Sequence, residues 1–512
     1  MRNRFYIILL CLLFPVLVAG QDLYSTISKV RPACVRMWGF DTVQQQRTSA
    51  QFSGVVVKGK YVLTAAHVTI PGNTYKVFFT DGREAIAKAL GKIELADDKT
   101  RPDVAMMMIV KGTDWPSAEM SESKLNDNEP CLSIAYPESL NQTQPTVRLG
   151  KVTEPLNSRG FIRSTALMEP GDSGGPLFNI RGELIGLHSA IEIPEAANYD
   201  VPVDLYQKYW LALQDPVVYH NWPEKSTFIA GKTRLSTFSW PKAGNYTGAY
   251  VKMTSFYKGQ AQNVLGTVVS SLVVSKSSLV GDSVIIMGKL ATVIARDKTN
   301  DLVLLRPVQK LKGISINPVT PQVGDFLFAP VEDSVVAGII SGGQLDLAKV
   351  SGGGFLGATP AHGSSPARVY FVRPGSPAAQ HDIRVGDILD GYADAAAFNA
   401  MIANLWPGDT VSVQLKRGAE ILKKTIVLTY PPQIVYDHPA DHFAGGKSLR
   451  RDGFKEVYTS DLVLKPEQCG GPVFDAKNHF CGIVIARFSR ANSIILTAET
   501  IRKFIETNYL KK

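Results

Sequence analysis

Three short segments in the first part of this 512-residue chain constrain its fold more than any other feature. His67 follows an apolar hairpin pattern over 52–68, Asp103 opens an apolar strand pattern, and Ser173 lies in the glycine-rich segment 171–176. A serine hydroxyl becomes a nucleophile when an imidazole takes its proton and a buried carboxylate holds that imidazole in one tautomer. The three segments therefore predict a β-rich fold that brings distant strand ends together at an acyl-transfer site.

The segment around Ser173 also predicts a site for negative charge. Glycine adopts backbone conformations that are closed to other residues, so the sequence GDSGGP can form a tight turn. Such a turn points the amides of Gly171 and Ser173 into one concavity, where they can stabilise an oxyanion. Each residue alone has an ordinary explanation as a packing histidine, a turn acid or a turn glycine. Their order and context together favour catalysis.

These segments resemble the trypsin fold, and in particular its HtrA branch, over a domain predicted at 21–213. The resemblance implies two six-stranded antiparallel barrels with the active site between them, and endopeptidase activity toward protein or peptide substrates. It also implies that His67 is the general base, Asp103 its orienting carboxylate and Ser173 the nucleophile. By the same resemblance, Gly171 and Ser173 form the oxyanion hole.

Two further parts of this domain resemble segments that contact substrate. Gly182–Ser189 is similar to the strand that pairs with the substrate backbone, which assigns Leu187, His188 and Ser189 to substrate binding. Leu167 occupies the place that floors the primary specificity pocket, which predicts a preference for apolar side chains. Ordinary core packing is the alternative for Leu167.

Asp172 departs from the pattern of trypsin-like zymogens. In those proteins the equivalent carboxylate pairs with a newly cut N-terminus, and the predicted mature start, Gln21-Asp22-Leu23, does not resemble such an end. Asp172 therefore either faces solvent or finds another cation. Because loops around the site of HtrA-like enzymes switch between ordered and disordered states, we expect activity to depend on loop ordering.

The pattern returns in altered form after a predicted linker at 214–232. In the matching register, Ser278 stands at the position of the base, Asp301 at that of the acid and Cys469 at that of the nucleophile. Without an imidazole, a thiol near its ordinary pKa of about 8.5 is mostly protonated at neutral pH. Glu467 also replaces the first glycine of the oxyanion turn, which disfavours the required backbone conformation. We therefore expect this second copy, at 233–351 and 430–512, to be noncatalytic.

The second copy is interrupted by a stretch at 352–429 that resembles a PDZ domain. The segments that carry this resemblance are 354–357, 369–372, 374–379, 385–389 and 407–417. A PDZ groove adds a peptide strand to a sheet edge, and loop amides capture the terminal carboxylate. The resemblance assigns the carboxylate loop to Gly354, Phe355, Leu356 and Gly357 and implies a C-terminal peptide ligand. The alternative is that these glycines only cap a strand. In the HtrA family the PDZ domain follows the protease domain, so its place here inside the second copy is a departure.

The N-terminus predicts export. Arg2 and Arg4 precede an apolar stretch at 5–18 that ends in small residues, which is typical of a signal peptide at 1–20. The stretch is shorter than the roughly 20 residues of a membrane-spanning helix, so no stable membrane insertion is expected. The predicted location is periplasmic or secreted.

Cysteine usage and charge exclude several other classes. Cys34 and Cys131 fall in the first domain, where a disulfide and two buried thiols are both open. The chain has no Cys/His cluster with zinc spacing and no glycine-rich phosphate loop after a strand, so neither a metal nor a cofactor is expected. The net charge of +9 is spread without dense basic runs, which argues against nucleic-acid binding.

The sequence thus predicts a mostly β protein with two trypsin-like double-barrel units in tandem and a small α+β PDZ-like domain inserted in the second. The favoured function is an exported serine endopeptidase whose second copy and PDZ domain dock peptides or regulate activity. The alternative is a noncatalytic, PDZ-containing peptide-binding receptor. HtrA-like trimers use an aromatic N-terminal segment, for which only 21–30 with Tyr24 is present, so a homo-oligomer is left open.

Overall fold

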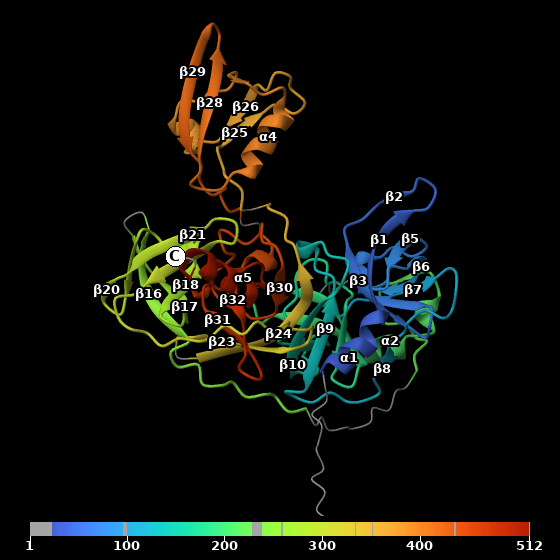
Figure 1. Cartoon of the computed structure of the whole chain (residues 1–512). Helices are drawn as coiled ribbons and strands as arrows, with labels where there is room; N and C mark the ends of the chain where they lie inside the picture. Colours follow the sequence, from blue (N-terminus) through green and yellow to red (C-terminus); the bar gives the residue numbers. More distant parts are fainter. Residues whose placement is uncertain are drawn as a thin grey trace, which may run out of the picture.

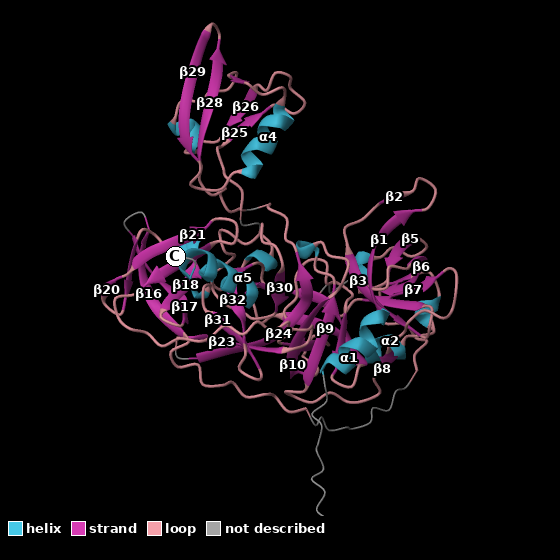
Figure 2. Cartoon of the chain, viewed as in Figure 1, coloured by secondary structure: helices cyan, strands magenta, loops and turns pink. Residues whose placement is uncertain are grey.

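The computed structural model describes residues 23–95, 100–227, 238–257, 260–332, 334–350, 352–434 and 437–510. The predicted signal peptide at 1–20 and the last part of the predicted linker, 228–232, lie outside these ranges. Two large β-rich bodies lie side by side, and a smaller body stands away from them (Figure 1). The body within residues 23–227 is here called the front unit and the body within 238–350 and 430–510 the rear unit, after their order in the sequence. Strands dominate all three, as Figure 2 shows.

The front unit consists of two six-stranded antiparallel barrels, as predicted. The strands of the first barrel pair in a closed circuit of β1 (Cys34–Asp41), β3 (Phe52–Val57), β4 (Tyr61–Thr64), β7 (Val104–Ile109), β6 (Glu84–Ile93) and β5 (Thr74–Phe78). The circuit of the second barrel is β9 (Pro130–Ala135), β10 (Thr146–Glu154), β11 (Ile162–Ser164), β14 (Asn198–Pro202), β13 (Glu183–Ile191) and β12 (Pro176–Asn179).

Short elements extend and cover these barrels. The added strands are β2 (Gln46–Arg47), β8 (Glu119–Met120) and β15 (Val218–Tyr219). The helices are α1 (Leu23–Val30) and α2 (Val203–Lys208). Strand β3 is buried along its whole length, because one side faces its own barrel and the other faces the second barrel. A continuous apolar run, in place of the usual alternation, suits such a doubly covered strand.

The rear unit repeats this plan, with one difference. Its first sheet has the strand order β20 (Lys289–Leu290), β19 (Ser283–Ile286), β16 (Tyr250–Tyr257), β17 (Gln260–Val269), β18 (Leu272–Lys276), β22 (Leu302–Arg306) and β21 (Thr292–Asp297). The sheet ends are not joined by a strand ladder within the described residues; instead, the Ala291 amide donates to the Val284 carbonyl at 2.8 Å.

The second half of the rear unit is a closed barrel. Its circuit is β23 (Phe326–Val331), β24 (Ser334–Leu345), β30 (Val457–Ser460), β33 (Ser493–Thr497), β32 (Phe480–Arg487) and β31 (Pro472–Asp475). Helix α5 (Ala498–Ile505) packs its apolar face on this barrel through Ile501 and Phe504. The predicted tandem of double-barrel units is therefore confirmed, with the first rear sheet nearly closed.

The small body lies between β24 and β30 in the sequence, where the insertion was predicted. It contains β25 (Ala358–Pro360), β26 (Val369–Val372), α3 (Pro377–Gln380), β27 (Ile388–Asp390), α4 (Ala395–Asn404), β28 (Thr410–Arg417) and β29 (Glu420–Val427). It has an apolar core of its own, which includes Leu356, Phe398 and Val413. A separate core is what allows an inserted domain to stand away from its host, as it does in Figure 1.

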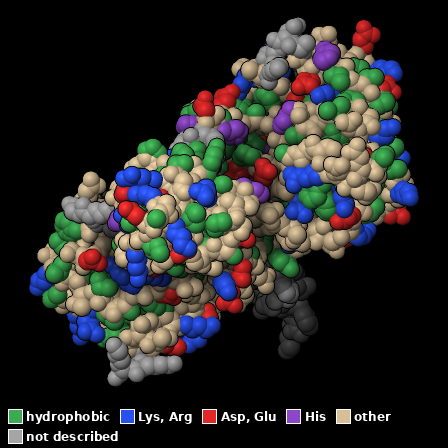
Figure 3. All heavy atoms as spheres, turned by 90° about the horizontal axis from the view of Figure 1, so that it is seen from above, with side chains coloured by type: hydrophobic (Ala, Val, Ile, Leu, Met, Phe, Trp, Pro, Cys, Tyr) green, Lys and Arg blue, Asp and Glu red, His purple; other side chains and the backbone are tan. Residues whose placement is uncertain are grey.

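Surface and thiol chemistry complete the description. Lys and Arg side chains are interspersed with Asp and Glu side chains on the face shown in Figure 3. The four cysteines of the described residues are all free and buried: Cys34, Cys131, Cys469 and Cys481. Cys34 and Cys131 are therefore two buried thiols and not a disulfide.

Among the described residues, no helix has the length and apolar character needed to cross a bilayer.

Candidate active site

Strand register in the first barrel brings His67 and Asp103 together. Strand β4 pairs with β7 so that Thr64 lies opposite Ala105. His67 follows the end of β4 in a 3₁₀ turn, and Asp103 immediately precedes β7, so both leave the barrel at the same place. The Asp103 Oδ2 atom accepts hydrogen bonds from the His67 amide at 3.0 Å and from His67 Nδ1 at 2.8 Å. These two bonds fix both the position and the tautomer of the imidazole.

Ser173 approaches the same imidazole from the second barrel. It lies in the turn before β12, and its Oγ atom is 3.0 Å from His67 Nε2. The Ser53 amide on β3 donates to the Ser173 carbonyl at 2.9 Å, which ties this turn to the first barrel. The three residues predicted from separate segments thus form one continuous chain of hydrogen bonds between the two barrels.

The charges of this chain are tuned by burial and by their partners. Burial raises the pKa of Asp103, but hydrogen bonds from His67 and Ser189 outweigh it and hold the pKa below its usual 3.8. Burial lowers the pKa of His67, but the hydrogen bond and the charge of Asp103 outweigh it and place the pKa above its usual 6.5. A basic imidazole beside an ionised carboxylate is suited to accept a proton from Ser173.

The turn that carries Ser173 leaves both predicted oxyanion donors, the amides of Gly171 and Ser173, available. The Pro170 carbonyl accepts a hydrogen bond from the Glu138 amide at 2.8 Å, so the Gly171 N–H of the same peptide plane points the opposite way. No described residue accepts a hydrogen bond from the amide of Gly171 or Ser173. Gly171 has φ +97°, and a Cβ there would lie 2.5 Å from the Glu138 nitrogen, so only glycine fits.

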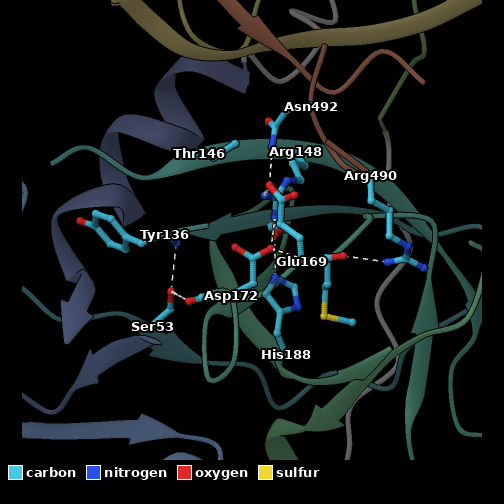
Figure 4. A network of polar contacts seen from close by, with 12 residues as sticks. Ser53, Tyr136, Thr146, Arg148, Glu169, Asp172, His188, Arg490 and Asn492 are labelled. Atoms are coloured by element: carbon cyan, nitrogen blue, oxygen red, sulfur yellow. Dashed lines mark hydrogen bonds and ion pairs between the residues drawn. The ribbon is translucent and has the colours of Figure 1, made fainter. Parts of the chain in front are cut away.

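Asp172 finds another cation, which decides between the two alternatives left by the sequence. Its side chain is buried, and its Oδ2 atom accepts hydrogen bonds from Arg148 Nη1 at 2.6 Å and from the Glu169 amide at 2.9 Å. Arg148 comes from β10, and its Nη2 atom lies 3.6 Å from Glu169 Oε1. Figure 4 shows the side chains of Arg148, Glu169 and Asp172 close together.

Of the residues assigned to the substrate-binding strand, only Ser189 reaches the site. Its hydroxyl donates to Asp103 Oδ1, so it supports the carboxylate. Leu187 is fully buried. His188 is also fully buried, with Nδ1 on Asp200 Oδ1 at 2.5 Å and Nε2 on Ser133 Oγ at 2.6 Å.

The main chain of His188 is occupied as well. Its amide donates to the Gly175 carbonyl, and its carbonyl accepts from the Gly174 amide. The assignment of His188 to substrate binding is therefore corrected: its main chain pairs with Gly174 and Gly175 and so supports the turn that carries Ser173. Leu167 is half-buried.

A cavity of about 380 Å³ adjoins His67 and Asp103. Its apolar wall includes Phe161, Tyr199 and Ile191, and Leu167 is not part of its lining. Sequence reasoning missed these wall residues, because aromatic and branched residues in strands are most often part of the core. Charged side chains line the rest of the cavity, so it is a candidate substrate subsite with both apolar and charged walls; they are Glu94, Arg101, Arg159 and Glu192.

The rear unit places Ser278, Asp301 and Cys469 in the register expected from the sequence. The Ser278 amide donates to Asp301 Oδ1 at 2.7 Å, as the His67 amide does to Asp103. Asp301 Oδ2 accepts from Ser278 Oγ at 2.7 Å and from Lys276 Nζ at 2.6 Å. The retained carboxylate is thus neutralised by a buried lysine instead of orienting an imidazole.

Cys469 lacks the surroundings of a nucleophile. It is fully buried, its nearest polar side-chain partner is Ser448 Oγ at 3.8 Å, and burial raises the pKa of its thiol. In addition, the Cys469 amide donates to the Pro466 carbonyl at 3.2 Å. The amide equivalent to that of Ser173 is therefore turned into the protein.

In the inserted domain, the predicted carboxylate loop is only partly open. The Gly354 amide donates to the Leu405 carbonyl and the Phe355 amide to the Thr429 carbonyl, both at 2.8 Å. A groove of about 250 Å³ runs between this loop and α4, where Phe398 and Ile402 line it. Of the four predicted amides, those of Leu356 and Gly357 remain candidates for capturing a carboxylate.

Residues 52–187 match the model of the trypsin-like peptidase domain. The periplasmic serine endoprotease DegP of Escherichia coli (strain K12) is 33% identical over 168 residues, which are 31% of this chain and 34% of that protein. The periplasmic pH-dependent serine endoprotease DegQ of the same strain is 32% identical over 149 residues, or 28% of this chain and 31% of that protein. The chain thus spans about a third of the length of these curated relatives.

Among solved structures, the serine endoprotease from Yersinia pestis covers 80% of this chain and 98% of its own, with a TM-score of 0.32 and 17% identity. That overlap is too weak to support a conclusion about the whole chain. The sequence match is local, and it falls on the front unit. The front unit is similar to HtrA-like trypsin-fold serine proteases.

Proposed function

We propose that this protein is a serine endopeptidase that cleaves protein or peptide substrates in the front unit. The observation that carries this proposal is the unbroken hydrogen-bond chain from Asp103 through His67 to Ser173, beside the amides of Gly171 and Ser173, which donate to no described residue. A protein that only bound peptides would not need a nucleophile, a base and an oxyanion site in this geometry.

The reaction follows from the positions of these groups. His67 Nε2 takes the proton from Ser173 Oγ as that oxygen attacks the scissile carbonyl carbon, and the amides of Gly171 and Ser173 receive the oxyanion. The imidazolium, stabilised by Asp103, then gives its proton to the leaving amine, and an acyl-enzyme remains. Water, deprotonated by His67, releases the acyl group and restores the serine. Every proton thus moves through one imidazole.

The rear unit is proposed to be noncatalytic, and the inserted body to be a PDZ domain that docks the C-terminus of a peptide. Support for the first statement comes from Lys276 on Asp301 and from the buried thiol of Cys469. Support for the second comes from the groove between the loop at 354–357 and α4. Export, to the periplasm or the medium, is proposed from the N-terminal sequence and from the periplasmic location in the relatives' names.

A serine-directed fluorophosphonate probe tests the proposed activity on the full chain. We expect the probe to label the wild type at one site, the Ser173→Ala variant to lose both labelling and casein cleavage, and the matched variant Cys469→Ala to keep both. A wild type that binds peptides but neither takes the label nor cleaves casein would favour the noncatalytic receptor instead.

A further inference from the structure

The rear unit packs directly on the part of the front unit that carries the oxyanion turn. Strand β24 of the rear unit lies against β10 of the front unit. Between them, the Asp461 carboxylate accepts hydrogen bonds from the Leu149 amide at 2.8 Å and from the Ile339 amide at 2.6 Å, so it joins one strand of each unit. The two units therefore share a built interface in addition to their linker.

Arg490 of the rear unit reaches into the front unit at Met168. Its guanidinium is fully buried, and Nη1 donates to the Met168 carbonyl at 2.7 Å and to Asn198 Oδ1 at 2.8 Å. The same Asn198 oxygen accepts from the Met168 amide at 3.1 Å, and Arg490 Nη2 donates to the Glu195 carbonyl. Both main-chain groups of Met168 are thus held by one polar cluster that is completed from the rear unit.

Asn492, two residues further along the same rear loop, holds the next residue of the front unit. Its Nδ2 atom donates to Glu169 Oε1 at 2.6 Å, and this oxygen also accepts from Ser139 Oγ at 3.0 Å. In Figure 4, Asn492 and Arg490 approach the Glu169 region from the rear unit, and Arg148 continues from Glu169 to Asp172. The contacts form a chain from the rear loop to the residue between the two oxyanion amides.

The front unit replaces these donors only in part. Among the described residues, the Met168 carbonyl has no donor other than Arg490, whereas the Glu195 carbonyl also accepts from Asn198 Nδ2 at 3.1 Å and Glu169 Oε1 also accepts from Ser139 Oγ. A buried acceptor without a donor is costly, so loss of the rear donors favours rearrangement of the segment toward water. That segment leads directly into Pro170, whose carbonyl orientation sets the direction of the Gly171 N–H. A rearrangement at Met168 and Glu169 would therefore reach the oxyanion hole within two residues.

We propose that the rear unit is a built-in activator of the front unit, in which Arg490 and Asn492 are positioning residues that hold Met168–Asp172 in the conformation that forms the oxyanion hole. This proposal rests on the proposed peptidase function. It assigns the degenerate copy a task that needs no chemistry of its own, because a fixed surface with two correctly placed donors is sufficient.

A negative charge introduced at one contact, with its matched rescue, tests the proposal on the full chain. Asn492→Asp places a carboxylate 2.6 Å from Glu169 Oε1, and we expect kcat for a peptide substrate to fall on the order of tenfold to a hundredfold while KM stays within about twofold. The double variant Asn492→Asp with Glu169→Gln restores a donor to the new carboxylate and should recover most of kcat. Arg490→Lys replaces the two donating guanidinium nitrogens with a single ammonium nitrogen, so we expect a smaller fall in kcat.

Asp461→Asn is the matched control for interface packing. It changes the carboxylate that joins the Leu149 and Ile339 amides across the interface, and it lies outside the contacts with Met168, Glu169 and Glu195. We expect its kcat to equal that of the wild type even if thermal unfolding begins at a lower temperature. The proposal is overturned if Asn492→Asp keeps wild-type kcat as Asp461→Asn does. An inactive wild type would instead contradict the proposed function, so the two failures are distinguishable.

Discussion

The turns at 170–173 and 466–469 have the same length and begin with the same residue, yet only the rear turn uses its last amide in a hydrogen bond of its own. In the front turn, Pro170 offers its carbonyl to Glu138 and leaves the amide of Ser173 free. In the rear turn, Pro466 offers its carbonyl to the amide of Cys469. The residue after the proline differs: it is Gly171 at φ +97° in front and Glu467 in the rear, where no left-handed conformation occurs.

A second glycine of the same turns is kept in both units, and the comparison shows why. A Cβ on Gly174 would lie 1.9 Å from Thr64 Oγ1, and a Cβ on Gly470 would lie 2.5 Å from Ser275 Oγ. Both glycines let the turn pack on the first barrel, which the fold needs in either unit. Gly171 packs closely on the Glu138 amide and is the proposed oxyanion donor. The rear unit therefore has the glycine that packs on the first barrel and has Glu467 where the front unit has Gly171.

The largest difference in kcat between variants of the two units should appear when the side chain at the base position is removed. Among the described residues, His67 is the only side-chain base within hydrogen-bond distance of Ser173 Oγ, so we expect His67→Ala to lower kcat on the order of 10⁴-fold or more. Ser278→Ala, at the equivalent rear position, should leave kcat unchanged. Steady-state cleavage of a chromogenic peptide measures both. A comparable loss in Ser278→Ala would mean that the rear site takes part in the reaction.

The turn glycine should give the next largest effect. Gly171→Ala adds a Cβ that meets the Glu138 nitrogen at 2.5 Å and needs φ +97°, so the turn must rearrange and one oxyanion donor is lost. We expect kcat to fall by roughly 10²- to 10³-fold with little change in KM. The control is Gly72→Ala, at φ +86° with no atom within 4 Å of the added Cβ, which should cost stability but not kcat. Equal kcat in the two variants would show that the Gly171 amide does not serve the reaction.

The next effect is on the pH dependence of kcat/KM, where we expect a smaller difference between variants of the two units. The neutral imidazole of His67 is the base, and its pKa lies above 6.5, so kcat/KM should fall about tenfold per pH unit below that pKa. Asp103→Asn removes the charge that raises this pKa. The acid limb of the residual activity should therefore move to lower pH, whereas Asp301→Asn should leave the profile in place. A profile that moves in Asp301→Asn and not in Asp103→Asn would reverse the assignment of the two sites.

The smallest effect concerns the rear thiol. Burial raises the pKa of Cys469, and its side chain is fully enclosed, so alkylation by iodoacetamide at pH 7.5 should be slower than that of free glutathione. Peptide mapping after timed quenching measures the rate at this residue. Modification faster than that of glutathione would indicate an activated thiol and would contradict the noncatalytic assignment.

The residues of the hydrogen-bond chain could be found from the sequence because each lies in a short segment whose neighbours fix its place. His67 follows a strand, Asp103 precedes one, and Ser173 lies between glycines, so local pattern and order were sufficient. The Ser278, Asp301 and Cys469 positions followed from the same logic. The trypsin-like double barrels and the inserted domain were predicted from the resemblance that these and later segments bear to known families.

The residues that hold the site together could not be found in this way. Arg490 and Asn492 contact partners 292 to 323 positions away along the chain, and Arg148 lies in an ordinary strand. Polar residues in loops and strands are most often solvated, so nothing local marks these as buried. His188 was misplaced for the opposite reason, because a histidine near the site suggested contact with substrate while Asp200 and Ser133 enclose it. The first sheet of the rear unit does not close through a strand pairing among the described residues. Whether a sheet closes depends on where its edge strands end, and sequence patterns define strand ends poorly.

A crystal structure of the full chain after reaction with a peptidyl phosphonate tests the central claim most directly. We expect one adduct per chain, bonded to Ser173 Oγ, with a phosphonyl oxygen within hydrogen-bond distance of the amides of both Gly171 and Ser173, and an unmodified Cys469. An adduct whose oxygen points away from these amides, or an adduct at Cys469, would contradict the account.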